Sequence, residues 1–203
     1  MKTFVKITIC GLMGLAVGLS SCDSSLLDTS PTGSISGDVI LKDASTAEMA
    51  VNGIIRMLYS VDGHEQFGVA SMAIMHDLMA EDMILGKEGN GWFTWDALYK
   101  IKPLYTRKDE RCYNIWNDNY SIISSANYIL AAETTMAGDR KAVDYIMGQA
   151  YALRAFAYFA LAQTYARTIV GHEKEKCVPI YTGPTVPSTT GQPRSSNEAV
   201  YAQ

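Results

Sequence analysis

Two long helical patterns joined by a very short turn constrain this chain most. The first runs from about Cys112 to about Met136, and its apolar stripe consists of Ile115, Ile122, Ala126 and Ile129. The second extends to about Thr168, and its stripe consists of Val143, Ile146, Met147, Ala150, Leu153, Phe156 and Ala157. Ala137-Gly138-Asp139 between them predicts a tight turn and an N-cap. Helices connected by so short a turn are expected to pack as an antiparallel hairpin.

Small residues suit the second of these helices to close packing. Ala152-x-x-x-Phe156 and Ala155-x-x-x-Phe159 resemble the small and aromatic spacing of tetratricopeptide units, although the full repeat signature is absent. We therefore expect an all-α fold of tetratricopeptide-like helical hairpins with long loops, incomplete at the C-terminus.

Two further helices are expected before this hairpin. Ser45 and Glu48 match a capping box, and the apolar face behind it consists of Val51, Ile54, Ile55 and Leu58. A second helix is expected over 66–85, with Val69, Met72, Ala73, His76, Met79 and Met83 along one side.

The last part of the chain has a different character. Residues 171–193 contain four of the six prolines and predict a loop. A second capping box, from Ser195 to Glu198, then predicts a helix that Gln203 cuts short. This favours a truncated helical domain over 44–203.

The N-terminus predicts a targeting segment. Lys2 and Lys6 precede an apolar run over 7–19, which is too short to span a bilayer comfortably. Leu19-Ser20-Ser21-Cys22 resembles the lipobox of bacterial lipoproteins, in which the cysteine is lipidated and the segment before it is removed. We expect a signal peptide over 1–21, lipidation at Cys22 and a lipidated tether over 22–43.

Charge and motifs exclude several classes of function. Loss of residues 1–21 would remove two of the 17 basic residues and none of the 21 acidic ones, which leaves a formal charge of −6. Such a chain is a poor candidate for nucleic-acid binding. It has no Ser-His-Asp signature, phosphate loop or CxxC motif, and the acids near His76 are most simply a solvated face. We therefore expect no enzyme activity, cofactor or metal.

The segment over 89–95 is unusually aromatic and offers a candidate ligand site. Trp92 and Trp95 could stack on sugar rings, and the Asn90 amide could bind their hydroxyls. The alternative is that the indoles pack beneath the loop as its own small core. Cys112 and Cys177 would lie near each other in the helical hairpin, and a disulfide and a buried free thiol are both open.

The chain resembles the N-terminal part of SusD/RagB outer-membrane lipoproteins. The resemblance rests on the order of Ser21-Cys22, Ile115-Trp116 to Tyr120, Ala126-Asn127, 148–155 with Tyr158, Val178-Pro179-Ile180 and 194–201. It implies a tetratricopeptide-like scaffold that is lipid-anchored in the outer membrane, is surface-exposed and takes part in carbohydrate uptake. It also implies a partner, a SusC-type TonB-dependent transporter, to which oligosaccharide or other nutrient ligands are delivered. In some members, aromatics before the third helix bind ligand, and Trp92 and Trp95 match that place.

A different class of function remains open. The chain could be a helical scaffold that docks the transporter and binds peptides rather than sugars, with the loop aromatics as interface anchors. The sequence does not identify the ligand.

Overall fold

A computed structural model describes residues 37–61, 63, 65–80, 82–86, 91–99 and 110–203. The signal peptide, Cys22 and most of the predicted tether lie outside the described residues, as does Asn90. The last residues assigned to the tether are part of the helical domain, because residues 37–40 form the short helix α2 (Gly37–Ile40) and Leu41 packs against the core.

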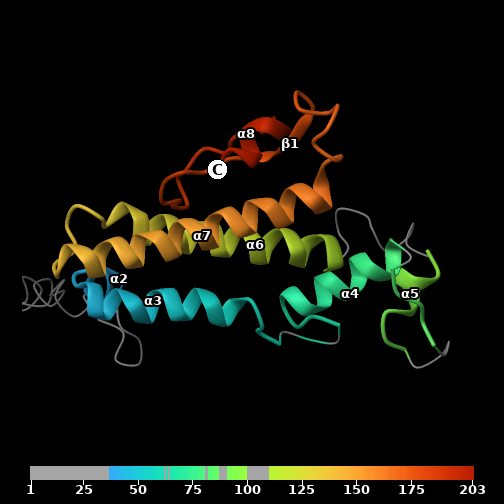
Figure 1. Ribbon diagram of the computed structural model, residues 1–203, viewed down its shortest axis with the longest axis horizontal. Coiled ribbons are helices and arrows are strands. Elements are labelled where there is room, and N and C mark those ends of the chain that lie inside the picture. Colours follow the sequence, from blue (N-terminus) through green and yellow to red (C-terminus); the bar gives the residue numbers. More distant parts are fainter. Residues whose placement is uncertain (1–36, 62, 64, 81, 87–90, 100–109) are drawn as a thin grey trace, which may run out of the picture. The chain divides into compact units, whose positions relative to one another are not determined.

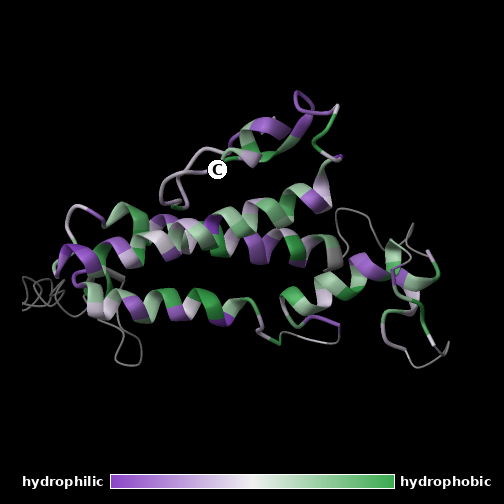
Figure 2. Cartoon of the chain, in the orientation of Figure 1, coloured by the Kyte–Doolittle hydropathy of each residue, from purple (hydrophilic) through white to green (hydrophobic). Residues whose placement is uncertain are grey.

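Three helices form the main body of residues 38–203, and Figure 1 shows α6 (Glu110–Ala131) beside α7 (Arg140–Tyr165), with α3 (Ala44–Met57) along them. Apolar and polar residues alternate along these helices, as expected when one face of each is buried (Figure 2). Their core includes Val51, Ile54, Ile122, Ile123, Ala126, Ile129, Val143, Ile146, Met147, Ala150, Ala157, Tyr158 and Leu161. The predicted all-α, tetratricopeptide-like hairpin is confirmed.

The turn between α6 and α7 is also hydrogen-bonded to the backbone at the start of α3. Gly138 has φ 127°, a conformation that favours glycine, and α7 begins after the N-cap Asp139. The Ala137 N–H donates to the Lys42 carbonyl (2.7 Å), and the Ala44 N–H donates to the Ala137 carbonyl (2.9 Å). The predicted turn and N-cap are confirmed, although the Asp139 side chain makes no capping hydrogen bond.

Both predicted capping boxes are wrong. The N-cap of α3 is Asp43, whose carboxylate accepts from the Ser45 N–H at 2.8 Å and from the Ser45 hydroxyl at 2.6 Å. The N-cap of α8 (Asn197–Tyr201) is Ser196, without a side-chain capping bond. Glu198 instead binds Lys174, so its carboxylate is engaged with a neighbouring chain segment.

The second predicted helix is shorter than the predicted range of 66–85, and it buries a different face. It is α4 (Val69–Met79), which starts after Gly68 at φ 69°, a conformation that no helix interior contains. It buries Met75 and Leu78, whereas Ala73 on the predicted apolar side is exposed. Ile55 and Phe156, also predicted in apolar stripes, are exposed as well.

Part of the predicted loop over 171–193 is a strand. β1 (Lys176–Pro179) pairs antiparallel with β2 (Arg194–Ser196), and Cys177 and Val178 of β1 are buried in the core. The Arg194 guanidinium donates to the Cys177 and Lys176 carbonyls, which holds the two strands together from one side. Apolar burial explains this strand better than any local pattern, because four residues carry too little periodicity to predict one.

Candidate functional site

The aromatic segment folds with one ring inside and two indoles outside. Phe93 is only 6% exposed, whereas Trp92 is 44% and Trp95 is 49% exposed. Trp95 belongs to the short helix α5 (Thr94–Ala97), and Trp92 directly precedes Phe93. The alternative in which both indoles form a buried core beneath the loop is therefore wrong. Both predicted stacking residues present indole surface to solvent.

Phe93 fixes this arrangement by its backbone conformation. Its φ of 51° lies in the left-handed region, which is unfavourable for a bulky residue and persists only where the surroundings hold it. Two contacts do so: the Phe93 N–H donates to the Glu65 carboxylate, and the ring packs in a small core with Met75 and Leu78.

Trp92 is supported by two other aromatic rings. Its ring centroid lies 6.2 Å from that of Phe67 and 6.5 Å from that of Phe93, both tilted, and Phe67 meets Phe93 edge-on at 6.0 Å. These are favourable aromatic geometries. The indole is thus half-exposed and held in place by its neighbours. A side chain that is already held loses less rotamer entropy when a ligand binds, which favours its use as a binding surface.

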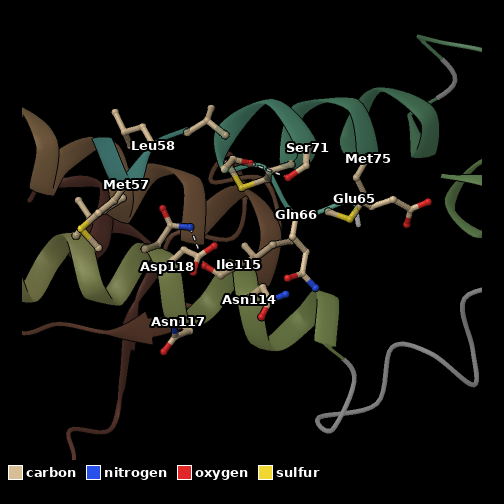
Figure 3. A pocket seen from close by; sticks show the side chains of 15 residues that line it. Met57, Leu58, Glu65, Gln66, Ser71, Met75, Asn114, Ile115, Asn117 and Asp118 are labelled. Carbon is tan, nitrogen blue, oxygen red and sulfur yellow. Dashed lines mark hydrogen bonds between the residues drawn. The ribbon is translucent and has the colours of Figure 1, made fainter. Parts of the chain in front are cut away.

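A cavity of about 260 Å³ lies next to the aromatic segment. Figure 3 shows its walls: the end of α3 and the start of α4 on one side, and the first turns of α6 on the other. The apolar wall includes Met57, Leu58, Met72 and Met75, and the polar wall includes Asn114, Asn117 and Asp118. Glu65, Met75 and Ile115 line the cavity and also contact the aromatic segment or its small core.

The polar wall includes a buried amide nitrogen without a hydrogen-bond partner among the described residues. The Asn119 amide donates to the Ile115 carbonyl (2.7 Å) and the Ser71 hydroxyl donates to the Gly68 carbonyl (2.8 Å), so these groups are occupied. Among the described residues, the Asn114 Nδ2 is buried and has no hydrogen-bond partner. A buried amide without a partner is costly, and a ligand oxygen would satisfy it.

One titratable side chain of α4 is also perturbed. Burial lowers the pKa of His76 from its ordinary value, and the charge of Asp77 offsets this only in part. The His76 Nε2 lies 3.4 Å from the Thr164 hydroxyl of α7. This histidine therefore joins α4 to α7 and does not line the cavity.

The remaining predicted site residues are not brought together. Cys177 is a buried thiol in β1, and no bond joins it to Cys112 in the part of the chain that the structure describes. The Cys112 carbonyl instead accepts from the Tyr165 hydroxyl at 2.6 Å. Cys22 and Asn90 lie outside the described residues.

Sequence reasoning missed the cavity itself. Its polar wall comes from Asn114, Asn117 and Asp118, which are spaced along one helix, and its apolar wall comes from methionines of two others. An asparagine pair three residues apart on a helix was a visible signal. The partner wall was not visible, because it depends on the docking of α4.

The described residues offer neither a metal centre nor a membrane-spanning helix. They contain no group of three or more His, Cys, Asp or Glu side chains placed to hold a metal ion. None of their helices is long and apolar enough to cross a membrane.

Known proteins share this fold. A family model named SusD-like, described as "Starch-binding associating with outer membrane", matches residues 36–203. A SusD-like carbohydrate-binding protein from Bacteroides vulgatus ATCC 8482 is 28% identical with a TM-score of 0.69 over 79% of this chain and 33% of its own. A SusD superfamily protein from Bacteroides thetaiotaomicron VPI-5482 is 20% identical with a TM-score of 0.56 over 79% and 34%. This chain thus spans about a third of these solved relatives. No curated protein sequence matches it.

Proposed function

Because the chain belongs to the SusD-like family, whose members are described as starch-binding and associating with the outer membrane, we propose that it binds glycans at the cell surface. In this proposal, residues 1–21 are removed, Cys22 carries the lipid anchor, and the bound oligosaccharide passes to a SusC-type TonB-dependent transporter. The protein acts by binding and delivery, without catalysis.

The exposed, braced indole of Trp92 is the observation that carries this proposal. Axial C–H bonds make one face of a sugar ring apolar, and a flat aromatic surface covers that face without requiring charge. Trp92 is held by Phe67 and Phe93 and is still 44% exposed. The adjoining cavity supplies the complementary polar contact through the Asn114 amide. Trp95, three residues further along the chain, is also half-exposed and offers a second indole.

Calorimetry on the purified chain with maltoheptaose and a panel of other neutral oligosaccharides tests this proposal. Stacking on one aromatic is worth about 1–3 kcal/mol by analogy with nucleobases. Trp92→Ala and Trp95→Ala should each weaken binding by about tenfold and lower the melting temperature less than Phe93→Ala does. Phe93→Ala is the matched control, because loss of its buried ring should lower the melting temperature more than it weakens binding. If the tryptophan variants melt early and bind normally, the segment is structural and the proposal fails.

Peptide binding is the second candidate, and the methionine wall is the observation that favours it. Met57, Met72 and Met75 line the cavity, and methionines adapt to varied apolar side chains at peptide-binding surfaces. In this case Trp92 and Trp95 would be interface anchors beside the transporter. A peptide array read beside the glycan panel separates the two functions, since Met72→Ala should impair peptide binding more than glycan binding.

A further inference from the structure

Another cavity, of about 290 Å³, lies between α6 and the segment that follows β1. Trp116, Tyr120 and Ser124 line it from α6, and Tyr181, Thr185 and Thr189 line it from the segment. No described residue lines both this cavity and the one beside the aromatic segment. Its volume is at the small end of ligand sites and suits one ring rather than a long chain.

The walls of this cavity are fixed by hydrogen bonds from helix side chains to loop carbonyls. The Asn127 amide donates to the carbonyls of Tyr181 (2.8 Å) and Gly183 (3.2 Å). The Tyr128 hydroxyl donates to the Thr185 carbonyl at 3.0 Å. Asn127 is itself held from behind, because Arg154 donates to its side-chain oxygen at 2.9 Å. The segment is thus attached at several points, and the cavity is preformed.

Three of the side chains that line the cavity are aromatic. The ring centroids of Trp116 and Tyr120 are 4.8 Å apart at an interplanar angle of 42°, and those of Tyr120 and Tyr181 are 6.0 Å apart at 84°. Together they form apolar faces that meet at an angle. Such faces suit the C–H surface of a saturated ring.

Three other lining side chains, Ser124, Thr185 and Thr189, carry hydroxyl groups whose hydrogen-bonding capacity is only partly used within the fold. The Ser124 and Thr185 hydroxyl oxygens are 3.2 Å apart, and this bond uses one of their two hydrogens. The Thr189 hydroxyl oxygen accepts from the Val186 N–H at 2.8 Å, which leaves its hydrogen for another acceptor. A ligand with several hydroxyl groups could bind these hydroxyls as donor or acceptor.

The cavity is lined by uncharged side chains. Among the described residues that line it there is no carboxylate, amine, guanidinium or imidazole. Burial raises the pKa of Tyr120, so its phenol stays neutral at physiological pH. Arg154 contacts Asn127 but does not line the cavity. An ionic ligand would therefore be desolvated here without a countercharge, which is strongly unfavourable.

We propose that this cavity is a separate binding site for a single neutral sugar ring, which packs against the aromatic rings of Trp116, Tyr120 and Tyr181 and hydrogen-bonds to the hydroxyls of Ser124, Thr185 and Thr189. The site does not depend on the proposed role of Trp92, because it lies on other residues and takes one ring.

Trp116 can report on this site alone. The chain has three tryptophans, and in a Trp92→Phe/Trp95→Phe background Trp116 is the one that remains. We expect methyl α-D-glucopyranoside to change its fluorescence saturably. Ser124→Ala and Thr185→Val should each raise the Kd about threefold to tenfold, the effect of one lost hydrogen bond. Ser71→Ala, in the wall of the other cavity, is the matched control and should have no effect. Near-ultraviolet circular dichroism checks that each variant is folded.

The outcomes are decisive in both directions. A non-saturating signal, or one that Ser124→Ala and Thr185→Val both leave unchanged, overturns the site. Glucuronate should bind at least tenfold more weakly than the neutral glycoside, and equal binding overturns the assignment to a neutral ring. Maltoheptaose binding by the chain with Trp92 intact is measured separately, so failure of that proposal leaves this result standing.

Discussion

The α3–α6–α7 bundle and the α4–α5 region are held together in different ways. The bundle has long helices and a continuous core in which Ala47, Ala126, Ala150 and Leu161 are fully buried. The α4–α5 region has a small core whose buried members are Met75, Leu78 and Phe93. Its other links are individual contacts, such as the Tyr99 hydroxyl donating to the Met79 carbonyl at 2.8 Å. The aromatic residues of the candidate glycan site lie in the second region, and α6 of the first supplies the polar wall of its cavity.

Backbone strain follows the same division. Among the described residues, the non-glycine residues with positive φ are Glu65, Phe93 and Tyr99, and all belong to the α4–α5 region. Such conformations cost about 1–3 kcal/mol each and are often retained where a side chain must be aimed. Because Phe93 lies between Trp92 and the first residue of α5, we expect its left-handed conformation to set the direction of both tryptophans at a cost in stability. The bundle carries no comparable strain in its described residues.

Removal of packing from the bundle should have the largest effect. Leu161→Ala, at a residue with no exposed surface, should lower the free energy of unfolding by about 2–5 kcal/mol, because it loses apolar burial and leaves a cavity. Tyr145→Ala is the control on the same helix: its side chain is 64% exposed, and the change should stay within about 0.5 kcal/mol. Urea unfolding measures both, and equal effects would contradict the assignment of the core to this helix face.

Gly68→Ala should detach the α4–α5 region while sparing the bundle. A Cβ at Gly68 would lie 2.1 Å from the Leu58 carbonyl oxygen, and that carbonyl accepts the Val69 N–H that starts α4. The clash is with backbone, so α4 must shift, at a cost of about 1–3 kcal/mol. Hydrogen exchange should quicken over 65–80 and stay slow over 143–161.

Gly53→Ala is the matched control with the opposite sign. Gly53 lies inside α3, and an added Cβ there would meet no atom within 4 Å. Alanine should therefore stabilise the chain by about 0.5–1 kcal/mol. Destabilisation by Gly53→Ala, or quickened exchange throughout the bundle in Gly68→Ala, would show that the two regions unfold as one.

Asn127→Ala tests the polar connection between the bundle and the segment after β1. It removes the amide that holds the Tyr181 and Gly183 carbonyls and leaves the buried Arg154 without that acceptor. The expected loss is about 1–3 kcal/mol, with faster proteolysis over 181–189. Asn117→Ala, exposed on the same helix, should change neither. Unchanged proteolysis in Asn127→Ala would mean that other contacts fix the segment.

The bundle could be predicted from sequence because its signals are long. The stripes over 112–136 and 140–168 repeat often enough to fix helix type and buried face, and Gly138 marks the turn between them. The first predicted capping box is wrong because Asp43, which precedes the predicted cap, accepts from the Ser45 N–H. The second is wrong because Ser196 is the N-cap and Glu198 binds Lys174. Phe156 was predicted in the buried stripe but is exposed, because its position at the edge of the stripe places it outside the core.

The site was predictable only as residue types. Trp92 and Trp95 stood out because large aromatics beside glycines and polar residues are unusual. Both are about half-exposed, and their role in ligand binding stays a prediction. The contacts that hold this segment could not be predicted from sequence. Phe67 and Glu65 contact Phe93, whose backbone adopts a left-handed conformation that no local pattern indicates. The cavity beside them depends on how α4 docks, which short helices do not encode in their own periodicity.

The smallest expected effect is a pH dependence that belongs to α4. Burial lowers the pKa of His76 below its ordinary value of 6.5, so the folded chain binds this proton less readily than the unfolded chain. Above pH 6.5 the His76 imidazole is mostly neutral in both the folded and the unfolded chain, so its burial does not make stability depend on pH there. As the pH falls through 6.5 toward the lowered folded pKa, the unfolded state takes up the proton first and stability is lost.

His76→Gln keeps a polar contact for Thr164 and removes the titration. Between pH 7.5 and 5, its melting temperature should therefore fall by less than that of the unmodified chain, with carboxylate contributions common to both. Hydrogen exchange should place the difference in α4 and not in α6, and identical pH profiles would show that His76 is as well solvated in the folded chain as in the unfolded one.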